Sequence, residues 1–419
     1  MNILIKSVKI FDNTNKNLHL QKRDILLKDG VIDKIAATIK EDGSEKIIRR
    51  DNLCVSIGWF DSSVSFGEPG YEERETIANG LKTAASGGFT DIVLNPNTNP
   101  IPYTSSTISF IKDRAKNTST TLHPLGALTV NSEGVDLAEL FDMSNAGAVG
   151  YSDHKKPTDN ANLLKIALQY AQNFNGLVYS FPLDTKIAGK GIVNEGSVST
   201  SLGLKGIPAL AEELQVARDL FILEYTGGKL HIPTISTAGS VKLIADAKKK
   251  GLDVSCNVAV QNLVFTDETL EEFDTNYKVL PPLRTKNDIT ALLKGVKTGV
   301  IDFITTDHTP LDIEQKKVEF DNAAYGTIGL ETAFGILNTI FDTETTIATL
   351  TKGRDRYGIH TPQIAEGEKA NLTLFDENST YTLTEKNTVS TSKNSIFYNQ
   401  TLKGKIFGVI ANNTTTIIN

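Results

Sequence analysis

Apolar residues come in short runs near both ends of the chain, and polar turns separate these runs. Near the start, runs stand at residues 3–5 and 25–27, and Lys28-Asp29-Gly30 separates the second run from Val31-Ile32. Asp-Gly supplies the residues that a tight hairpin prefers, so this pattern predicts strand, hairpin and strand. The tail repeats the pattern at 370–376 and 404–410. The β-rich ends indicate one discontinuous β-sandwich, built from residues 1–55 and 361–419.

Between these ends, strand-like and helix-like stretches alternate. A helix is predicted at 76–85, because the pattern stops at Gly87-Gly88. Strands are predicted at 91–94, 147–151, 229–232, 253–256 and 301–305, each followed by a polar loop. Such alternation is typical of a parallel sheet wrapped by helices. We therefore expect a (β/α)8 barrel of the TIM type over residues 56–360, with any functional site in the loops after the strands.

Composition and charge narrow the classes of function. The formal net charge of −7 argues against a general nucleic-acid binder, which usually presents a basic face. No stretch approaches the roughly 18 apolar residues of a membrane span, and the N-terminus lacks the features of a secretory signal. Cys54 and Cys256 lack the spacing of a metal or redox motif, which favours buried free thiols. We expect a cytoplasmic protein with no nucleic-acid or membrane partner.

The segment from Gly58 to Gly70 and several later motifs carry a family resemblance. The motifs include Gly87-Gly88-Phe89-Thr90, Pro96-Asn97-Thr98, Tyr151-Ser152-Asp153, His231-Ile232-Pro233-Thr234, Pro281-Pro282-Leu283-Arg284 and Thr306-Asp307-His308. In this order and at these spacings the chain resembles the dihydroorotases of the amidohydrolase superfamily. The resemblance implies the barrel with its terminal β-sandwich, a zinc site, and hydrolysis of a cyclic amide.

The resemblance also implies metal ligands that this sequence does not have. Serine and threonine stand where the family has four imidazole ligands, at Ser63, Ser65, Ser180 and Thr234. Asp153 matches the metal-bridging position, and Asp307 matches the general base. A hydroxyl stays neutral and donates weakly near pH 7, so it replaces imidazole poorly at zinc. We expect no zinc at the mouth of the barrel, where these residues should cluster; Asp61, Asp153 and Asp307 could hold a hard divalent cation weakly, or bond backbone amides instead.

Substrate recognition differs from the family pattern as well. Gly67 stands where the resemblance implies an arginine that holds the substrate carboxylate, and Leu280 replaces an asparagine. Asn97 is retained as a residual substrate-binding residue. His154 and His308 each follow a site aspartate, so they could form an acid–base pair or act as supporting hydrogen-bonding residues.

Three functional interpretations remain open at this point. The first is a dihydroorotase-like pseudoenzyme of pyrimidine biosynthesis, in which Asp307 is inactive and the protein has a structural role, with aspartate transcarbamoylase as the partner that the resemblance implies. The second is an active dihydroorotase with an atypical metal site, and the third is a small-molecule binding protein that uses the old pocket. A homodimer is also expected.

Overall fold

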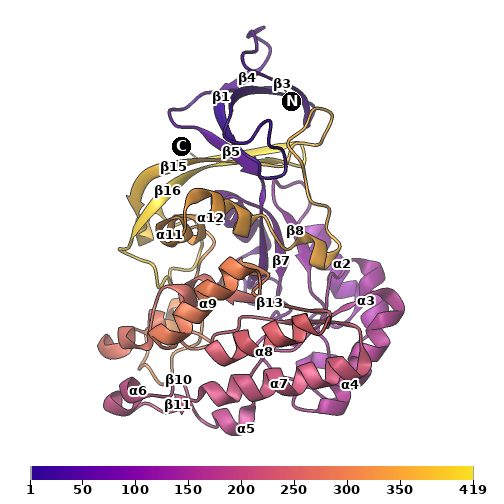
Figure 1. The fold of residues 1–419 in the computed structure, drawn as a ribbon, viewed down its shortest axis with the longest axis vertical. Helices are drawn as coiled ribbons and strands as arrows, with labels where there is room; N and C mark the ends of the chain where they lie inside the picture. The colour runs from indigo at the N-terminus through magenta and orange to yellow at the C-terminus, as the bar shows by residue number, and fades with distance from the viewer. Residues whose placement is uncertain (1, 419) are drawn as a thin grey trace.

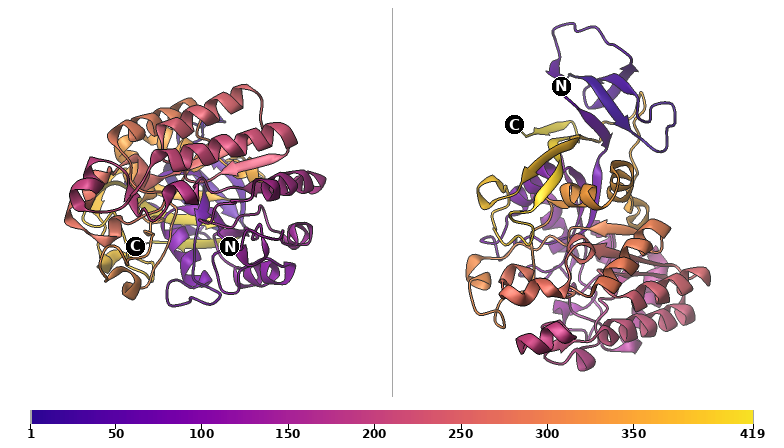
Figure 2. Two further views of the ribbon diagram at one scale, coloured as in Figure 1. Left: turned by 90° about the horizontal axis from the view of Figure 1, so that it is seen from below. Right: turned by 60° about the vertical axis from the view of Figure 1, so that its left-hand side comes forward.

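The computed structural model describes residues 2–418, and Met1 and Asn419, the outer limits of the predicted sandwich, lie outside the described residues. Both ends of the chain contribute strands to one sheet with the order β17-β16-β15-β5-β1-β2-β3, and β4 pairs with β1. The strands are β1 (Ile3–Phe11), β2 (Lys22–Lys28), β3 (Val31–Ala36), β4 (Lys46–Ile48), β5 (Cys54–Ile57), β15 (Leu372–Thr382), β16 (Thr401–Ala411) and β17 (Thr414–Ile417). The junction between the two ends is the antiparallel pair β5–β15, in which Ile57 lies opposite Leu372. This sheet lies at one end of the molecule, where β15 and β16 cover α11 and α12 of the α/β body (Figures 1 and 2).

The predicted hairpin joins β2 to β3, with Lys28 paired to Val31. Asp29 has φ 48° and Gly30 has φ 80°. Two consecutive positive φ angles are what a two-residue turn requires to match the twist of the flanking strands, and aspartate and glycine tolerate this region best. The local sequence therefore determines this turn.

Parallel strands of the α/β body close into a barrel. Its strands are β6 (Trp59–Val64), β7 (Phe89–Leu94), β8 (Thr121–Pro124), β9 (Leu177–Tyr179), β12 (Lys229–Ile232), β13 (Val254–Ala259) and β14 (Phe303–Thr305). They pair in parallel within two groups, β6–β7–β8 and β9–β12–β13–β14. Tyr151 bridges the first gap through Gly126 and Val178, and a bridge between Val64 and His308 closes the ring. The predicted barrel fold is therefore confirmed.

The strand predicted at 147–151 is present only as the bridge residue Tyr151. Gly147 has φ 103° and ends the preceding helix, and Ala148 N–H donates to Met143 O at 2.9 Å. Because these groups finish a helix, the backbone cannot be extended there. The fourth barrel strand is correspondingly short.

Helices follow the barrel strands and cover the outside of the barrel (Figure 1). They are α1 (Ile77–Ser86), α2 (Ser105–Arg114), α3 (Leu140–Ala146), α4 (Ala161–Ala171), α7 (Ala209–Thr226), α8 (Ala238–Lys249), α9 (Lys286–Thr298), α11 (Ala333–Ile340) and α12 (Thr343–Leu350). Shorter elements are α5 (Thr185–Ala188), β10 (Val193–Asn194), α6 (Ser197–Leu202), β11 (Gly206–Ile207) and α10 (Ile313–Lys316). The helix predicted at 76–85 is α1, whose cap Thr76 accepts from Asn79 N–H. Among the described residues, no helix is long and apolar enough to cross a bilayer.

Aromatic side chains join the terminal sheet to the barrel. Trp59, fully buried at the start of β6, packs against Phe334 of α11 and Phe375 of β15, with ring centroids 4.8 and 5.8 Å apart. Inside the barrel, Phe60, Tyr179, Phe303 and Tyr357 form a separate apolar layer. This layer fills part of the barrel interior with apolar side chains.

Candidate functional site

Three residues at the mouth of the barrel have backbone conformations that side chains usually avoid. Thr234, just after β12, has φ 47°, Asp307, just after β14, has φ 48°, and His154, after the bridge residue Tyr151, has φ 56°. This region is costly for residues other than glycine, most of all for a β-branched one. Thr234 N–H donates to Asn257 Oδ1, whose amide donates to Ser62 Oγ at 2.8 Å. Tertiary hydrogen bonds thus hold the strand ends in place.

The two serines of the first barrel strand share one partner. Asn95 Nδ2 lies 3.1 Å from Ser63 Oγ and 3.1 Å from Ser65 Oγ. Ser63 Oγ also donates to Asp307 Oδ1 at 3.5 Å. Ser63, Ser65 and Asp307 therefore lie together, as the sequence predicts, whereas Ser180 Oγ is buried without a partner among the described residues.

Asp307 is paired with a lysine that the sequence analysis missed. Lys155 Nζ lies 2.8 Å from Asp307 Oδ2, and the two side chains are 15% and 3% exposed. Burial raises the pKa of Asp307, and the Lys155 ammonium opposes this effect. The carboxylate that the resemblance assigns as the general base thus forms an ion pair with a lysine of the same chain. The signal was the basic pair Lys155-Lys156, which follows Asp153-His154 in the loop after the fourth strand.

Asp153 and Asp61 both accept hydrogen bonds from backbone N–H groups. Asp153 accepts from Leu128 N–H and Thr129 N–H at 3.0 Å each, and from Thr129 Oγ1 at 2.6 Å. Asp61 accepts from Thr306 N–H at 3.0 Å and Ser63 N–H at 3.1 Å. Burial raises the pKa of both carboxyls, and these hydrogen bonds lower it. The two aspartates follow the alternative in which a strand-end carboxylate bonds neighbouring amides.

This set of side chains does not fit the zinc that the resemblance implies. Zinc sites in proteins are built from imidazole, thiolate and free carboxylate donors. Here the positions in question carry hydroxyls, at Ser63, Ser65, Ser180 and Thr234. The Asp153 carboxylate accepts three hydrogen bonds from the loop after β8, and Asp307 forms an ion pair with Lys155. A metal would have to displace these partners before it gained a charged ligand.

The loop around Gly67 leaves no room for a side chain. A Cβ at Gly67 would lie 1.7 Å from Tyr71 O, an impossible approach to backbone. Gly67 N–H donates to Glu75 O at 2.8 Å, and Tyr71 N–H donates to Gly67 O at 2.9 Å. The Tyr71 carbonyl thus occupies the space that the side chain of an arginine at position 67 would need. Asn97 keeps a buried Oδ1 without a partner among the described residues.

The two candidate histidines have separate environments. Burial and the charge of Lys155 lower the pKa of His154 to about 3, so its imidazole is neutral at pH 7. His308 Nδ1 accepts from Gly329 N–H at 3.2 Å, and its Nε2 lies 3.8 Å from Glu75 Oε2. These contacts favour supporting hydrogen-bonding roles over an acid–base pair.

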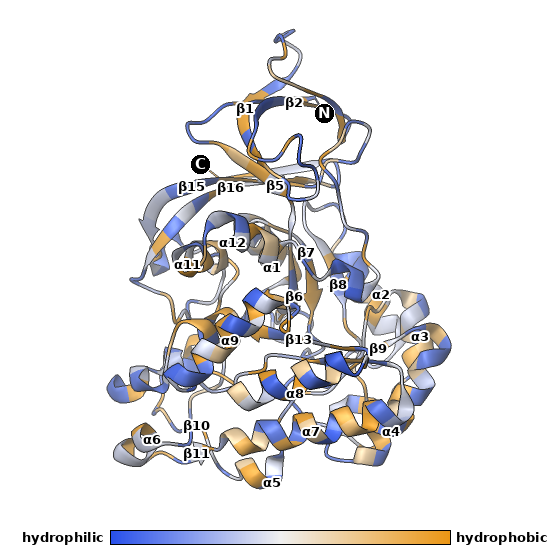
Figure 3. Cartoon of the chain, in the orientation of Figure 1, coloured by the Kyte–Doolittle hydropathy of each residue, from blue (hydrophilic) through white to orange (hydrophobic). Residues whose placement is uncertain are grey.

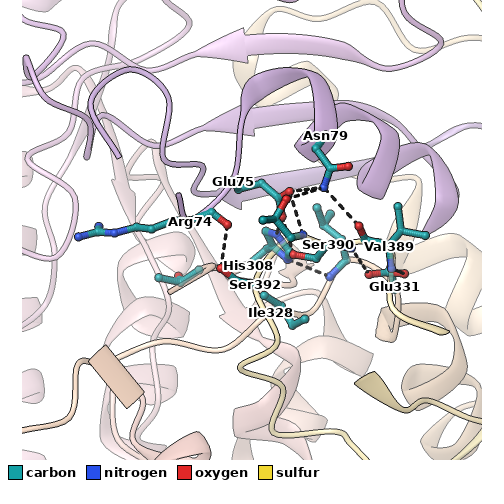
Figure 4. A network of polar contacts seen from close by, with 12 residues as sticks. Arg74, Glu75, Asn79, His308, Ile328, Glu331, Val389, Ser390 and Ser392 are labelled. Atoms are coloured by element: carbon teal, nitrogen blue, oxygen red, sulfur yellow. Dashed lines mark hydrogen bonds and ion pairs between the residues drawn. The ribbon is translucent and has the colours of Figure 1, made fainter. Parts of the chain in front are cut away.

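A segment between β15 and β16 reaches the barrel mouth and joins the His308 network (Figure 4). Ser390 Oγ donates to Glu75 at 2.5 Å, and the amides of Val389 and Ser390 donate to Glu331 at 2.8 and 3.2 Å. Asn394 Nδ2 donates to Thr309 O at 3.0 Å in the loop after β14. Part of the range predicted as sandwich, residues 388–396, therefore lies against barrel loops.

The amino-acid sequence matches a family model and several known proteins. A family model described as dihydro-orotase-like matches residues 54–240. The chain is 39% identical over 411 residues to a dihydroorotase from Pelotomaculum thermopropionicum, with 96% of each chain covered. It is 40% identical over 419 residues to one from Caldicellulosiruptor saccharolyticus, covering 98% of this chain and 97% of the relative.

Solved structures resemble the fold at lower identity. An L-hydantoinase (dihydropyrimidinase) from Arthrobacter aurescens superposes with a TM-score of 0.84 at 20% identity, covering 100% of this chain and 97% of that one. A D-hydantoinase from Thermus sp. has a TM-score of 0.81 at 19% identity, covering 99% and 95%. These likenesses show the amidohydrolase fold, and the identity to the dihydroorotases over nearly the full length shows more: the chain belongs to the dihydroorotase family.

Proposed function

We propose that this chain serves pyrimidine biosynthesis as a dihydroorotase homologue that no longer hydrolyses a cyclic amide and acts through its structure. The observation that carries the proposal is the ion pair of Lys155 with Asp307. A general base must accept a proton from a nucleophile within hydrogen-bond reach. In this arrangement one oxygen of Asp307 receives the Lys155 ammonium at 2.8 Å and the other receives Ser63 Oγ at 3.5 Å, so each oxygen already has a partner within the chain.

The closed loop at Gly67 supports the proposal independently. A bidentate arginine–carboxylate contact is strong and geometrically specific. Its loss removes a charge that would hold an acidic substrate, and the Tyr71 carbonyl blocks any side chain at position 67. Proton transfer and substrate placement are thus weakened by separate features.

The relatives favour a second candidate, an active dihydroorotase with an atypical site. The matched relatives carry the name dihydroorotase and cover almost the whole chain. This candidate requires Lys155 to leave Asp307 when substrate or a metal enters.

One experiment separates the two candidates. The purified chain is assayed in both directions, on dihydroorotate and on carbamoyl aspartate, with and without added Zn²⁺, and its metal content is measured. We expect rates equal to those of Asp307→Ala and of buffer, and no stoichiometric zinc. Turnover by the wild type that Asp307→Ala abolishes would establish the active candidate.

The structural role is tested in the cell that makes the protein. We propose aspartate transcarbamoylase as the partner and the cytoplasm as the compartment. Withdrawal of this chain should lower the stability or activity of the transcarbamoylase, and both wild type and the double variant Lys155→Met/Asp307→Asn, which leaves no unpaired buried charge, should restore it. Rescue by wild type alone would show that the site is needed.

A further inference from the structure

The terminal sheet carries a cleft whose lining is rich in positive charge. Five cations line it, and we name it the basic cleft after them: Lys6, Lys9, Lys22, Arg49 and Arg50. Its volume of about 640 Å³ falls within the roughly 300–1,000 Å³ of small-molecule sites. Figure 3 shows blue, hydrophilic segments among the orange strands at this end of the molecule. The positive lining contrasts with the formal net charge of −7 of the whole chain.

Three carboxylates also line the basic cleft, and two of them already form ion pairs. Asp24, which is buried, pairs with Lys6. Glu377 Oε1 lies 2.8 Å from Lys9 Nζ. The third carboxylate, Asp51, is exposed. Five cations against three carboxylates leave a local excess of two positive charges.

Two of the cations lie directly opposite each other on neighbouring strands. The antiparallel pair β1–β2 places Lys9 opposite Lys22. Like charges at opposed positions of two strands destabilise a sheet. Glu377 offsets the charge of Lys9, whereas Lys22 forms no ion pair with any described residue. An anion held between the two ammonium groups would therefore relieve a repulsion that the fold leaves in place.

Arg50 is fixed in position, while most of its N–H donors have no partner among the described residues. Its guanidinium carbon lies 4.7 Å from the centre of the Phe407 ring, and its Nη2 donates to Ile418 O at 3.0 Å. A guanidinium carries five N–H donors in one plane, a geometry that matches phosphate oxygens. Because two neighbours already hold Arg50, it loses little conformational freedom when a ligand binds.

Neutral donors line the basic cleft beside these charges. They are the side chains of Ser7, Thr38, Asn52 and Asn378, and none of them hydrogen-bonds another described residue. Ser7 has φ 51° at the bulge of β1, and a bulge turns a side chain away from the regular alternation of a strand. Hydroxyl and amide groups donate to phosphate oxygens without adding charge. The lining therefore offers donors to several acceptor oxygens at once.

We propose that the basic cleft binds a chain of two or three phosphates, either free or as part of a nucleotide. Such a group presents several negative charges and many acceptor oxygens, which Lys9, Lys22, Arg50 and the neutral donors can contact together. The site joins both ends of the chain, since Lys9 belongs to β1 and Asn378 to β15. It lies outside the barrel mouth and does not depend on whether Asp307 is active. A ligand that binds only the folded sheet stabilises that sheet by mass action.

Isothermal titration calorimetry of the purified full chain with inorganic tripolyphosphate, at low salt and without divalent cations, tests the site. We expect one site per chain, with an affinity that falls as salt is added, because salt screens the charges. Lys22→Glu should weaken binding by about tenfold or more, since it turns an attraction into a repulsion. Lys249→Glu on α8, at a side chain 77% exposed, makes the same charge change and should keep the affinity. No heat of binding at millimolar tripolyphosphate, or equal affinities for the two variants, overturns the proposal.

Two further measurements identify the ligand and its place. Adenosine and uridine triphosphates that bind as tightly as tripolyphosphate would assign recognition to the phosphate chain alone, and tighter binding would add contacts to the nucleoside. Equal affinity for orthophosphate would refute a site for a phosphate chain. Acetylation of lysine amines, followed by mass spectrometry, should show Lys9 and Lys22 protected by tripolyphosphate and Lys249 unprotected. Equal protection of all three lysines would show that the anion binds without a defined site.

Discussion

Lys155 Nζ and Asp307 Oδ2 lie 2.8 Å apart in the mouth of the barrel, and little of either side chain reaches solvent. The pair brings together the loops after the fourth and the last barrel strands. A buried charge that loses its partner is costly, commonly by about 3–5 kcal/mol, because desolvation is then uncompensated. The ion pair therefore stabilises the fold only while both charged side chains are present.

We expect Lys155→Met to lower the free energy of unfolding by about 3 kcal/mol at pH 7, measured by urea denaturation. The neighbouring Lys156, which is exposed and whose Nζ donates to Ser132 O at 3.2 Å, provides the control: Lys156→Met should change little. The double variant Lys155→Met/Asp307→Asn should recover most of the loss, because no unpaired charge remains. Equal stability of wild type and Lys155→Met would show that Asp307 does not depend on this lysine.

Gly67→Ala should be destabilising by about 1–3 kcal/mol, because a methyl group forced into packed structure moves its neighbours. The neighbour here is the Tyr71 carbonyl, a backbone atom that cannot rotate away. Gly196→Ala is the control, since its Cβ would meet nothing closer than 3.7 Å. Thermal and urea unfolding of both variants give the comparison, and a Gly67→Ala protein as stable as Gly196→Ala contradicts the closed loop.

Asp91 should make folding sensitive to acid. Burial raises its pKa, but His123 and Arg354, at 3.0 and 2.9 Å, lower it to about 2 from the ordinary 3.8. The unfolded chain therefore binds this proton first as the pH falls. A contribution of about 2 kcal/mol, present above pH 4, should be lost between pH 4 and pH 2. The difference in unfolding free energy between wild type and Asp91→Asn, measured across this range, should shrink accordingly; a constant difference would contradict the lowered pKa.

Lys316 should make the folded protein more stable as the pH rises in the alkaline range. Its Nζ donates to Thr275 O at 2.7 Å and Lys278 O at 3.3 Å, without a carboxylate at either contact. Burial and the charge of Lys278 lower its pKa from 10.5 to about 7. Between these values the unfolded chain holds the extra proton, so stability should rise with pH by up to roughly 1.4 kcal/mol per unit. Lys316→Met should lack this rise between pH 7 and 10, and parallel pH profiles for the two proteins would refute it.

The parts of the fold that depend on residues close together in the sequence could be predicted. Asp29-Gly30 gives the hairpin, Thr76 and Gly87 bound α1, and the alternation of apolar runs gives the barrel. The strand at 147–151 was predicted too long, because an apolar run does not reveal that Gly147 ends a helix. Length and period alone cannot separate these cases.

The site was predictable in its residue types but less so in its contacts. Hydroxyls at positions 63, 65, 180 and 234 are visible in the sequence, whereas the partners of Asp153 and Asp307 lie 24 and 152 positions away. Such pairings depend on how the barrel closes. Helix α7 shows a related limit, because an apolar row on a helix has the same spacing whether it is buried or exposed.

The pairing of Ile57 with Leu372 has a consequence for the order in which the protein is made. The strands before β6 leave the ribosome first, and the edge of β5 waits for β15 until nearly the whole chain has been synthesised. The barrel can form during that interval, since domains fold as units during synthesis. Any product that stops before β15 exposes an unpaired strand edge, the feature that recruits other chains into aggregates. The edge of β5 is therefore covered only after β15 has been synthesised.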